Sequence, residues 1–266
     1  MFSIVFSDVD GTLLNDNHQI TPLTYHAIKN IQKQGIEFVI VSARSPSGIY
    51  PILNKYSLEC SMIAYSGALI LDKQKNVLFE KGMESTKAID IIQYIEKEKL
   101  DISWNVYYFD QWIVKDRTDL RIQKEECIVE AISQEGTIED IAQLSTVHKI
   151  LCICSKKETA QIEKKLKNQF PHLMIVKSSP TLIEIMEENI SKALAVKKLC
   201  QMYNVNTNHA IAFGDQYNDL EMLKIVGYGY VMKNAPIDIQ KEIDRVTLDN
   251  NHDGIYEALD HLNLLK

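Results

Sequence analysis

The chain carries the stretch FSIVFSDVDGT at residues 2–12, in which an apolar run leads directly into Asp8, Asp10 and a glycine. Residues 2–7 are predicted to form a buried strand, because uninterrupted apolar runs are typical of parallel sheets covered on both faces. Two carboxylates this close in the sequence repel each other. We therefore expect a metal ion, a shared proton or a calcium-binding loop to offset the repulsion between them.

Similar apolar strands alternate with helical segments in two parts of the chain. Strands are predicted at 36–41, 62–66, 68–72, 77–81, 210–215 and 228–233. Helices are predicted at 22–34, from Pro46 onward, and at 190–203, 219–226 and 255–262. This alternation predicts an α/β fold whose core is a doubly wound parallel (Rossmann-like) sheet.

The middle of the chain, 84–186, shows a different pattern. The segment ISWNVYYFDQWIVKD at 102–116 alternates in polarity around a turn, which is typical of an antiparallel hairpin. A helix near 120–133, a strand at 147–154, a helix at 156–168 and strands near 172–186 complete the predicted elements. We interpret this part as an α+β domain inserted into a core formed by 1–83 and 187–266.

The composition excludes several classes of protein. With 45% hydrophobic and 24% charged residues, the 266-residue chain has the balance of a soluble globular protein. No apolar run approaches the ~20 residues that cross a bilayer, and the first residues lack a basic leader, so a cytoplasmic protein without a membrane partner is expected. The net charge of −7 argues against nucleic-acid binding. An anionic substrate would therefore need a local metal ion or a single lysine.

Polar residues follow the predicted strands at positions where a parallel sheet binds its ligands, the carboxyl ends of the strands. The candidates either follow such a strand or begin a core helix: Asp8, Asp10, Ser42, Arg44, Lys192, Asp215 and Asp219. Because these strand ends share one edge of a sheet, we expect the side chains to converge on one crevice.

The spacing of the residues excludes a helical calcium loop. Such a loop beginning at Asp8 needs glycine at its sixth position and glutamate at its twelfth, where this chain has Leu13 and Gln19. A cluster of carboxylates instead suits Mg²⁺, which takes oxygen ligands and retains waters that a phosphate can replace. Asp8, Asp10 and Asp215 are therefore candidates for a magnesium site.

These residue types also suit phosphoryl transfer. A carboxylate can attack phosphorus once Mg²⁺ and a lysine ammonium reduce the repulsion between two anions. A second acid can protonate the leaving oxygen and then deprotonate water. Asp8, Asp10, Asp215 and Lys192 supply this set of groups.

The motifs resemble those of the haloacid dehalogenase-like (HAD) phosphatases. DVDGTLL at 8–14 resembles the first signature of that family, Ser42 the second, Lys192 the third, and GDQYND at 214–219 the fourth. The insertion and the run VMKNAP at 231–236 are similar to the Cof-type branch, whose members have an α/β cap. The resemblance covers essentially the whole chain, and it identifies 84–186 as the cap domain.

The resemblance also implies roles for individual residues. Asp8 would be the nucleophile and Asp10 the general acid and base, with Mg²⁺ held by Asp8, the Asp10 carbonyl and Asp215. Asp219 is either a further metal ligand or only the N-cap of the helix that follows it. The predicted phosphate-binding residues are Ser42, Ala43, Arg44, Lys192 and Asn218.

The prediction is a Mg²⁺-dependent phosphatase that hydrolyses small phosphorylated metabolites, either sugar phosphates or phosphorylated cofactors, through an aspartyl-phosphate. The alternatives are a phosphomutase on the same scaffold and a non-catalytic metabolite-sensing protein. We expect the cap, rather than the four motifs, to determine which substrate is chosen.

Overall fold

The structure is a computed structural model that describes residues 2–265, and it divides into two compact units. The core unit contains residues 2–43, 53–79 and 191–265, and the inserted unit contains Arg44–Ile52 and Glu80–Ile190. The sequence placed the insertion at 84–186. The units divide a few residues outside those limits, and the inserted unit also includes the short segment that follows Ala43.

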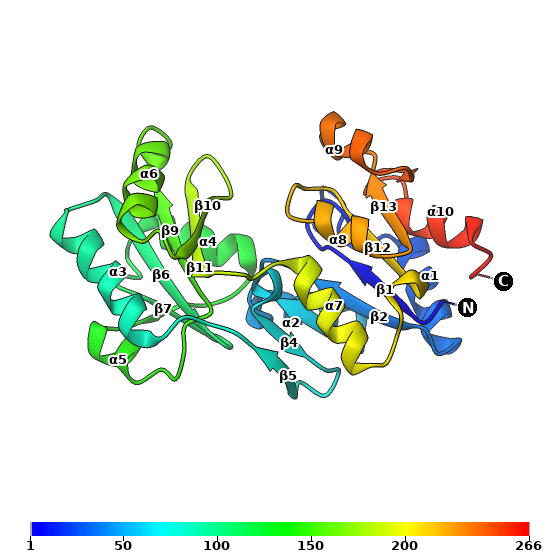
Figure 1. Cartoon of the computed structure of the whole chain (residues 1–266), viewed down its shortest axis with the longest axis horizontal. Helices are drawn as coiled ribbons and strands as arrows, with labels where there is room; N and C mark the ends of the chain where they lie inside the picture. The colour runs from blue at the N-terminus through cyan, green and yellow to red at the C-terminus, as the bar shows by residue number, and fades with distance from the viewer. Residues whose placement is uncertain (1, 266) are drawn as a thin grey trace. The chain divides into compact units, whose positions relative to one another are not determined.

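The core unit is built on an eight-stranded sheet with the order β14-β13-β12-β1-β2-β3-β4-β5 (Figure 1). These strands are β1 (Ile4–Ser7), β2 (Glu37–Val41), β3 (Ser61–Ala64), β4 (Leu69–Leu71), β5 (Val77–Glu80), β12 (Ala210–Gly214), β13 (Tyr228–Met232) and β14 (Val246–Thr247). All pairs from β14 to β3 are parallel, which confirms the predicted doubly wound sheet. β4 runs antiparallel to β3 because the turn at Tyr65–Gly67 is too short for a parallel crossover.

Helices connect the parallel strands of the core unit. α1 (Pro22–Lys33) joins β1 to β2, α8 (Leu220–Ile225) joins β12 to β13, and α9 (Ile237–Glu242) joins β13 to β14. α2 (Pro46–Tyr56) joins β2 to β3 but begins in the segment 44–52 of the inserted unit, α7 (Lys192–Met202) leads into β12, and α10 (Gly254–His261) follows β14. α1 begins as its sequence predicts, with Pro22 in the first turn and the Thr21 hydroxyl accepting a hydrogen bond from the Thr24 N–H. The short helix α9 was not predicted.

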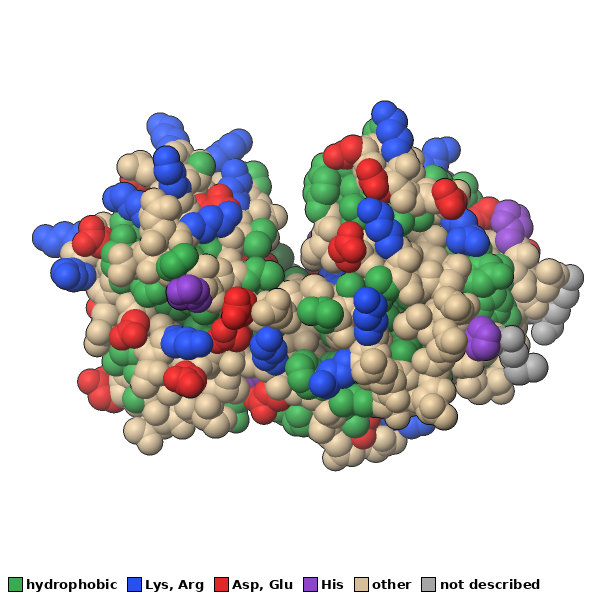
Figure 2. Space-filling view, viewed as in Figure 1, with side chains coloured by type: hydrophobic (Ala, Val, Ile, Leu, Met, Phe, Trp, Pro, Cys, Tyr) green, Lys and Arg blue, Asp and Glu red, His purple; other side chains and the backbone are tan. Residues whose placement is uncertain are grey.

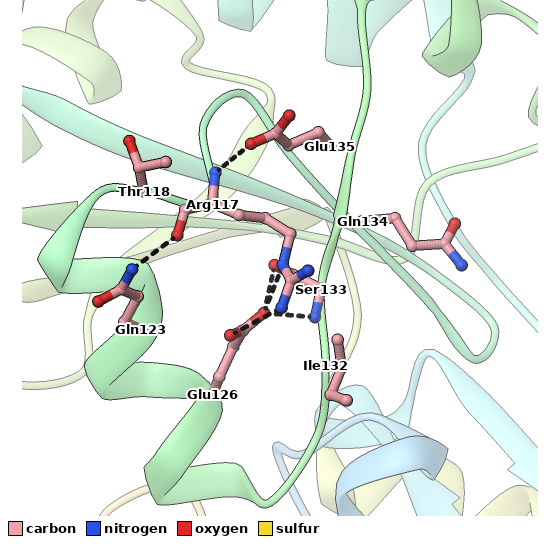
Figure 3. A pocket seen from close by; sticks show the side chains of 8 residues that line it. All are labelled: Arg117, Thr118, Gln123, Glu126, Ile132, Ser133, Gln134 and Glu135. Carbon is pink, nitrogen blue, oxygen red and sulfur yellow. Dashed lines mark hydrogen bonds and ion pairs between the residues drawn. The ribbon is translucent and has the colours of Figure 1, made fainter.

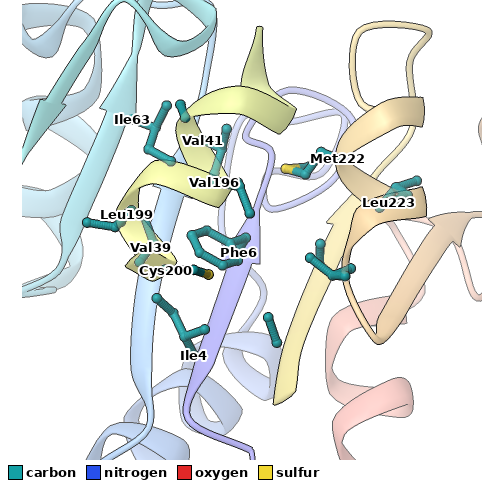
Figure 4. Close-up of a cluster of buried hydrophobic side chains, with 14 of the residues drawn as sticks. Ile4, Phe6, Val39, Val41, Ile63, Val196, Leu199, Cys200, Met222 and Leu223 are labelled. Atoms are coloured by element: carbon teal, nitrogen blue, oxygen red, sulfur yellow. The ribbon is translucent and has the colours of Figure 1, made fainter. Parts of the chain in front are cut away.

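The hydrophobic core of this unit packs α7 and α8 against the sheet (Figure 4). Phe6, Val39 and Ile63 project from three neighbouring strands, and Val196 and Leu199 project from α7. Each of these side chains is fully buried, and burial of one contributes roughly 1.5–3 kcal/mol. This packing fixes α7, and therefore its first residue, against the core sheet.

The inserted unit contains a six-stranded sheet with the order β10-β11-β9-β6-β7-β8. Its strands are β6 (Ile102–Tyr108), β7 (Gln111–Val114), β8 (Gln134–Glu135), β9 (Lys149–Cys154), β10 (Leu173–Lys177) and β11 (Leu182–Glu187), and its helices are α3 (Ser85–Lys97), α4 (Leu120–Val129), α5 (Ile138–Ala142) and α6 (Thr159–Gln169). β6 and β7 form the predicted antiparallel hairpin. α3 was not predicted, although its buried residues Ala88, Ile91, Ile92 and Ile95 have helical spacing.

The hydrophobic core of the inserted unit lies on one face of its sheet, where Val106, Ile150 and Ile185 pack with residues of α3 and α6. On the face of the molecule in Figure 2, cationic and anionic side chains both occur on each unit. Within residues 2–265, no helix is both long and apolar enough to span a membrane.

Candidate active site

The ends of β1 and β12 bring two aspartates of distant sequence position to neighbouring strands. Ser7 pairs with Phe213 in the parallel ladder, and the Asp8 N–H continues this ladder by donating to the Phe213 carbonyl at 3.0 Å. Asp215 follows directly after β12. Both aspartates are almost fully buried. The parallel pairing therefore places both carboxylates at one edge of the sheet.

Lys192 joins two carboxylates of this edge. It is the first residue of α7, and the Ser191 hydroxyl caps the helix by accepting a hydrogen bond from the Leu194 N–H. The Lys192 Nζ donates to Asp8 Oδ1 at 2.5 Å and to Asp219 Oδ1 at 2.6 Å. All three side chains are at most 9% exposed, so water screens these charges little.

Burial and charge shift the protonation equilibria of the cluster. Burial raises the pKa of Asp8 well above its usual range, and the Lys192 ammonium offsets part of this effect. Burial acts on Lys192 in the opposite direction, but the Asp8 and Asp219 carboxylates together raise the pKa of its ammonium above the ordinary value. Burial also raises the pKa of Asp215, against hydrogen bonds from Thr12 and Gln216. A further cation beside these carboxylates would therefore be strongly favoured.

Asp219 shapes the loop that follows β12. Its Oδ2 accepts hydrogen bonds from the N–H groups of Asp215 at 3.1 Å and Gln216 at 3.0 Å, while its Oδ1 contacts Lys192. A Cβ atom on Gly214 would lie 2.5 Å from the Asp219 Cβ, so the glycine is required for this close approach. The side chain makes no hydrogen bond to the first turn of α8, which differs from a simple N-cap.

The Asp215 carboxylate accepts hydrogen bonds from side chains that were not among the predicted site residues. The Thr12 hydroxyl donates to its Oδ1 at 2.8 Å, and the Gln216 amide donates to its Oδ2 at 2.9 Å. Gly11 has a positive φ of 81°, and a Cβ there would lie 2.5 Å from Asp215 Oδ2. Gln216 directly follows Asp215 in the fourth motif, and Thr12 lies two residues after Asp10 in the first, and membership of these motifs was the signal available in the sequence.

The carboxylates fit a hard divalent cation. One oxygen from each of Asp8, Asp215 and Asp219 can be chosen so that the three atoms lie within 4.8 Å of one another, and all three residues are buried. Carboxylate oxygens are the ligands that Mg²⁺ prefers. Lys192 supplies a single positive charge to this group, so the cluster can accept a divalent cation without an excess of positive charge.

Comparison with known proteins identifies the family. The family model of haloacid dehalogenase-like hydrolases matches residues 5–259. A Haemophilus influenzae protein named as an inferred phosphatase is 35% identical over 96% of both chains. The chain belongs to the haloacid dehalogenase-like hydrolase family. Phosphatase YwpJ of Bacillus subtilis is 27% identical over 97% of this chain and 99% of its own.

Solved structures of the family share the whole fold. A haloacid dehalogenase-like hydrolase from Bacteroides thetaiotaomicron aligns with a TM-score of 0.90 and 26% identity, covering 98% of this chain and all of that one. A sugar phosphatase of HAD subclass IIB aligns with a TM-score of 0.82 at 19% identity, over 98% of this chain and 99% of that one. The matches to phosphatases support the predicted enzyme class, a phosphoric monoester hydrolase of the HAD family.

The remaining predicted site residues of this HAD hydrolase lie in segments that follow strands of the core sheet, and their roles stay predictions. Asp10 is exposed and forms a backbone bridge with Leu14. Ser42 is buried directly after β2, where its N–H donates to the Ile63 carbonyl at 2.8 Å. Asn218 is exposed in the loop between β12 and α8.

The two residues after Ser42 fall on different sides of the division between the units. Ala43 ends a segment of the core unit, and Arg44 is the first residue of the inserted unit. The Arg44 guanidinium donates to the Gly48 carbonyl at 3.2 Å.

A separate hollow of about 850 Å³ lies in the inserted unit (Figure 3). Its charged groups are paired with one another: the Arg117 Nε lies 3.1 Å from Glu126 Oε1, and the Ser133 hydroxyl donates to the same oxygen at 2.7 Å. The residues lining it do not include a carboxylate pair held by a lysine. The buried cluster around Lys192 is therefore the better candidate for catalysis.

Proposed function

We propose that this protein is a Mg²⁺-dependent phosphatase of small phosphorylated metabolites that works through an aspartyl-phosphate on Asp8. One observation carries the proposal: Asp8, Lys192, Asp215 and Asp219 form one buried cluster at the carboxyl edge of the parallel sheet. A purely structural role explains this cluster poorly, because burying several charges costs more than burying apolar residues of similar size.

In the proposed reaction Asp8 is the nucleophile. One of its carboxylate oxygens forms a bond to phosphorus while the ester P–O bond breaks. The Lys192 ammonium is in direct contact with Asp8 and reduces the repulsion between the carboxylate and the phosphate. Asp10 then gives a proton to the leaving oxygen, so the organic product departs as a neutral alcohol.

Hydrolysis of the aspartyl-phosphate regenerates the enzyme. Asp10, now a carboxylate, takes a proton from a water molecule whose oxygen attacks phosphorus. The bond to Asp8 breaks and inorganic phosphate leaves. When bound by Asp8 and Asp215, Mg²⁺ would supply charge neutralisation at the phosphoryl oxygens. Asp219 would contribute by holding Lys192 and the backbone of Asp215 in place.

The inserted unit would select the rest of the substrate, with sugar phosphates or phosphorylated cofactors as the candidate classes. Residue alternation places Lys149 on the sheet face opposite the hydrophobic core, because its neighbour Ile150 belongs to that core. The Lys149 Nζ lies 4.0 Å from Glu184 and 5.2 Å from the centre of the Tyr107 ring. A lysine, a carboxylate and an aromatic ring together suit a ligand that carries several hydroxyl groups.

The direct test is hydrolysis of p-nitrophenyl phosphate by the purified full-length protein, with Mg²⁺ and after its removal with EDTA. We expect turnover with Mg²⁺ and its loss after chelation. A panel of phosphorylated sugars and cofactors then ranks the natural candidates. Transfer of the phosphoryl group back to the sugar would indicate a phosphomutase instead. If the protein hydrolysed none of the compounds in the panel, the proposal would be contradicted.

A further inference from the structure

Asn234 contacts two loops of the candidate active site with a single side chain. It follows β13 by two residues, and its amide nitrogen donates to the Gly11 carbonyl at 2.8 Å and to Asp215 Oδ2 at 3.4 Å. Its side-chain oxygen accepts a hydrogen bond from the Asn250 N–H at 3.3 Å. The loop that follows Asp10 in the sequence and the loop that follows β12 therefore both contact this amide.

The loop behind Asp10 depends on contacts of this kind. Gly11 has a φ of 81°, and glycine has more backbone freedom than any other residue, so an external hydrogen bond to the Gly11 carbonyl helps to hold the Gly11–Thr12 peptide in one orientation. Asn234 provides it at Gly11, and the Asn250 amide provides a second at the Leu14 carbonyl, at 3.0 Å. The segment 11–14, which directly follows the proposed acid and base, is thus fixed at both ends.

The Asp215 carboxylate is oriented from two sides. The Thr12 hydroxyl holds Oδ1, and the amides of Gln216 and Asn234 hold Oδ2. An ionised carboxylate has about four acceptor positions, so three donors fix its rotation and still leave capacity for a cation. Hydrogen-bond partners behind a metal ligand commonly change metal affinity by ~10–100-fold.

We propose that Asn234 is a positioning residue that tunes Mg²⁺ affinity by fixing Asp215 and the loop behind Asp10 at the same time. The inference rests on the proposed function. It makes the segment after β13 part of the metal site, although that segment contributes no carboxylate to the buried cluster. Removal of the amide loosens the Asp215 carboxylate and the Gly11 peptide together.

The chain offers a matched control in Gln240. Its amide donates to the carbonyls of Lys233 at 3.0 Å and Ala235 at 2.8 Å, so it stabilises the same loop as Asn234. The contacts described for Gln240 do not include Asp215 or Gly11. A merely structural role of the loop predicts the same effect from either substitution, whereas the positioning role predicts a difference.

The experiment is calorimetric titration of the EDTA-treated, full-length protein with MgCl₂ in the absence of substrate, with thermal unfolding of each variant as a folding check. We expect Asn234→Ala to weaken Mg²⁺ binding by about 10-fold and Gln240→Ala to change it by less than about twofold. If Asn234→Ala unfolds, Asn234→Ser is measured against the same criterion.

Two results overturn the inference: Mg²⁺ affinity of the Asn234 variant within twofold of the wild type, or an equal loss in Gln240→Ala. Failure of the wild-type protein to bind Mg²⁺ and to hydrolyse p-nitrophenyl phosphate would instead reject the proposed function. The two failures are therefore distinguishable in one set of measurements.

Discussion

The two units bury their polar side chains in different ways. The core unit gathers Asp8, Lys192, Asp215 and Asp219 into one charged cluster. In the inserted unit, a fully buried polar side chain such as Asn105 is satisfied by neutral neighbours. Its amide donates to the carbonyls of Ser103 at 3.0 Å and Leu151 at 2.9 Å, and its oxygen accepts the Trp112 indole N–H at 2.8 Å.

His148 extends this contrast to a titratable group. Its ring is fully buried beside β9, where Nδ1 accepts the Phe109 N–H at 3.1 Å. Burial lowers the pKa of His148 to about 4 even though its Nε2 lies 3.2 Å from Glu80 Oε1, so the ring is neutral at neutral pH. The inserted unit thus keeps this buried histidine uncharged and pairs its buried Lys149 with Glu184, whereas the core unit gathers several buried charges around Lys192.

Sheet topology accounts for the difference. Parallel strands end at the same edge of a sheet, so residues as distant in sequence as Asp8 and Asp215 meet after neighbouring strands. Antiparallel strands end at alternate edges, so their end residues do not all gather at one edge. Asn105 is satisfied instead by groups of its own strand and of the two neighbouring strands. We therefore expect the chemistry in the core unit and substrate recognition in the inserted unit, and the following variants test that division.

The largest effect is expected from Asp8→Asn. The amide preserves the shape of the side chain but is neither a nucleophile nor an anionic metal ligand, so turnover should fall on the order of 10⁵-fold or more. The measurement is kcat for p-nitrophenyl phosphate, with circular dichroism to confirm folding. Asp90→Asn, an exposed position on α3, serves as the control and should remain active. A folded Asp8 variant that retained more than about a tenth of kcat, a change of ~1.4 kcal/mol, would remove the nucleophile assignment.

A smaller loss is expected from Asp10→Asn. The substitution removes the proposed acid and base but retains the backbone carbonyl, so kcat should fall by ~10²–10⁴-fold while Mg²⁺ affinity changes little. Both quantities are measured, kcat at saturating Mg²⁺ and affinity by calorimetry. A large loss of affinity together with normal kcat would instead make the Asp10 side chain a metal ligand.

His148 predicts a pH dependence of stability in the inserted unit. Its pKa of about 4 in the folded state lies below the value of ~6.5 in an unfolded chain, so the unfolded state binds the extra proton. The contribution of His148 to the free energy of unfolding is therefore fully present above pH ~6.5. It is lost as the pH falls towards 4, by about 3 kcal/mol in total. Trp104 and Trp112 both belong to this unit, so tryptophan fluorescence during urea unfolding reports it selectively.

The control for this pH dependence is a second histidine of the same unit. His148→Gln should flatten the decline between pH 6.5 and 4.5, whereas His172→Gln, at an exposed position, should leave it unchanged. A constant difference between wild type and His148→Gln across this range would show that the ring does not carry the effect.

The smallest expected effect tests recognition by the inserted unit. Lys149→Met should lower kcat/KM for the preferred sugar phosphate by about 10-fold, equivalent to ~1.4 kcal/mol, and leave p-nitrophenyl phosphate turnover nearly unchanged. Lys115→Met is the control, because that lysine is 62% exposed and pairs with Glu96 at the surface. An unchanged ranking of the substrate panel would assign specificity to the core unit.

The sequence by itself determined the architecture of the core unit and the candidates for its chemistry. Apolar runs and helical periodicity are local properties, so β1, β2, α1 and the β6–β7 hairpin could be predicted from short windows. The same holds for Asp8, Lys192 and Asp215, because each directly follows a recognisable strand or begins a recognisable helix. α3 and α9 were left unassigned, although the buried residues of α3 have helical spacing.

Only the tertiary structure decided how these groups are held. Thr12 contacts Asp215 across 203 positions of sequence, and Asn234 contacts Gly11 across 223. Tertiary structure likewise decided which groups the two oxygens of Asp219 contact, Lys192 and the Asp215 N–H. It also decided that Arg44 belongs to the inserted unit. A hydrogen bond depends on a few tenths of an ångström between atoms that the chain brings together only when the sheet has formed. The position of a residue in the sequence determines which strand it follows. Tertiary packing determines which atom its side chain contacts there.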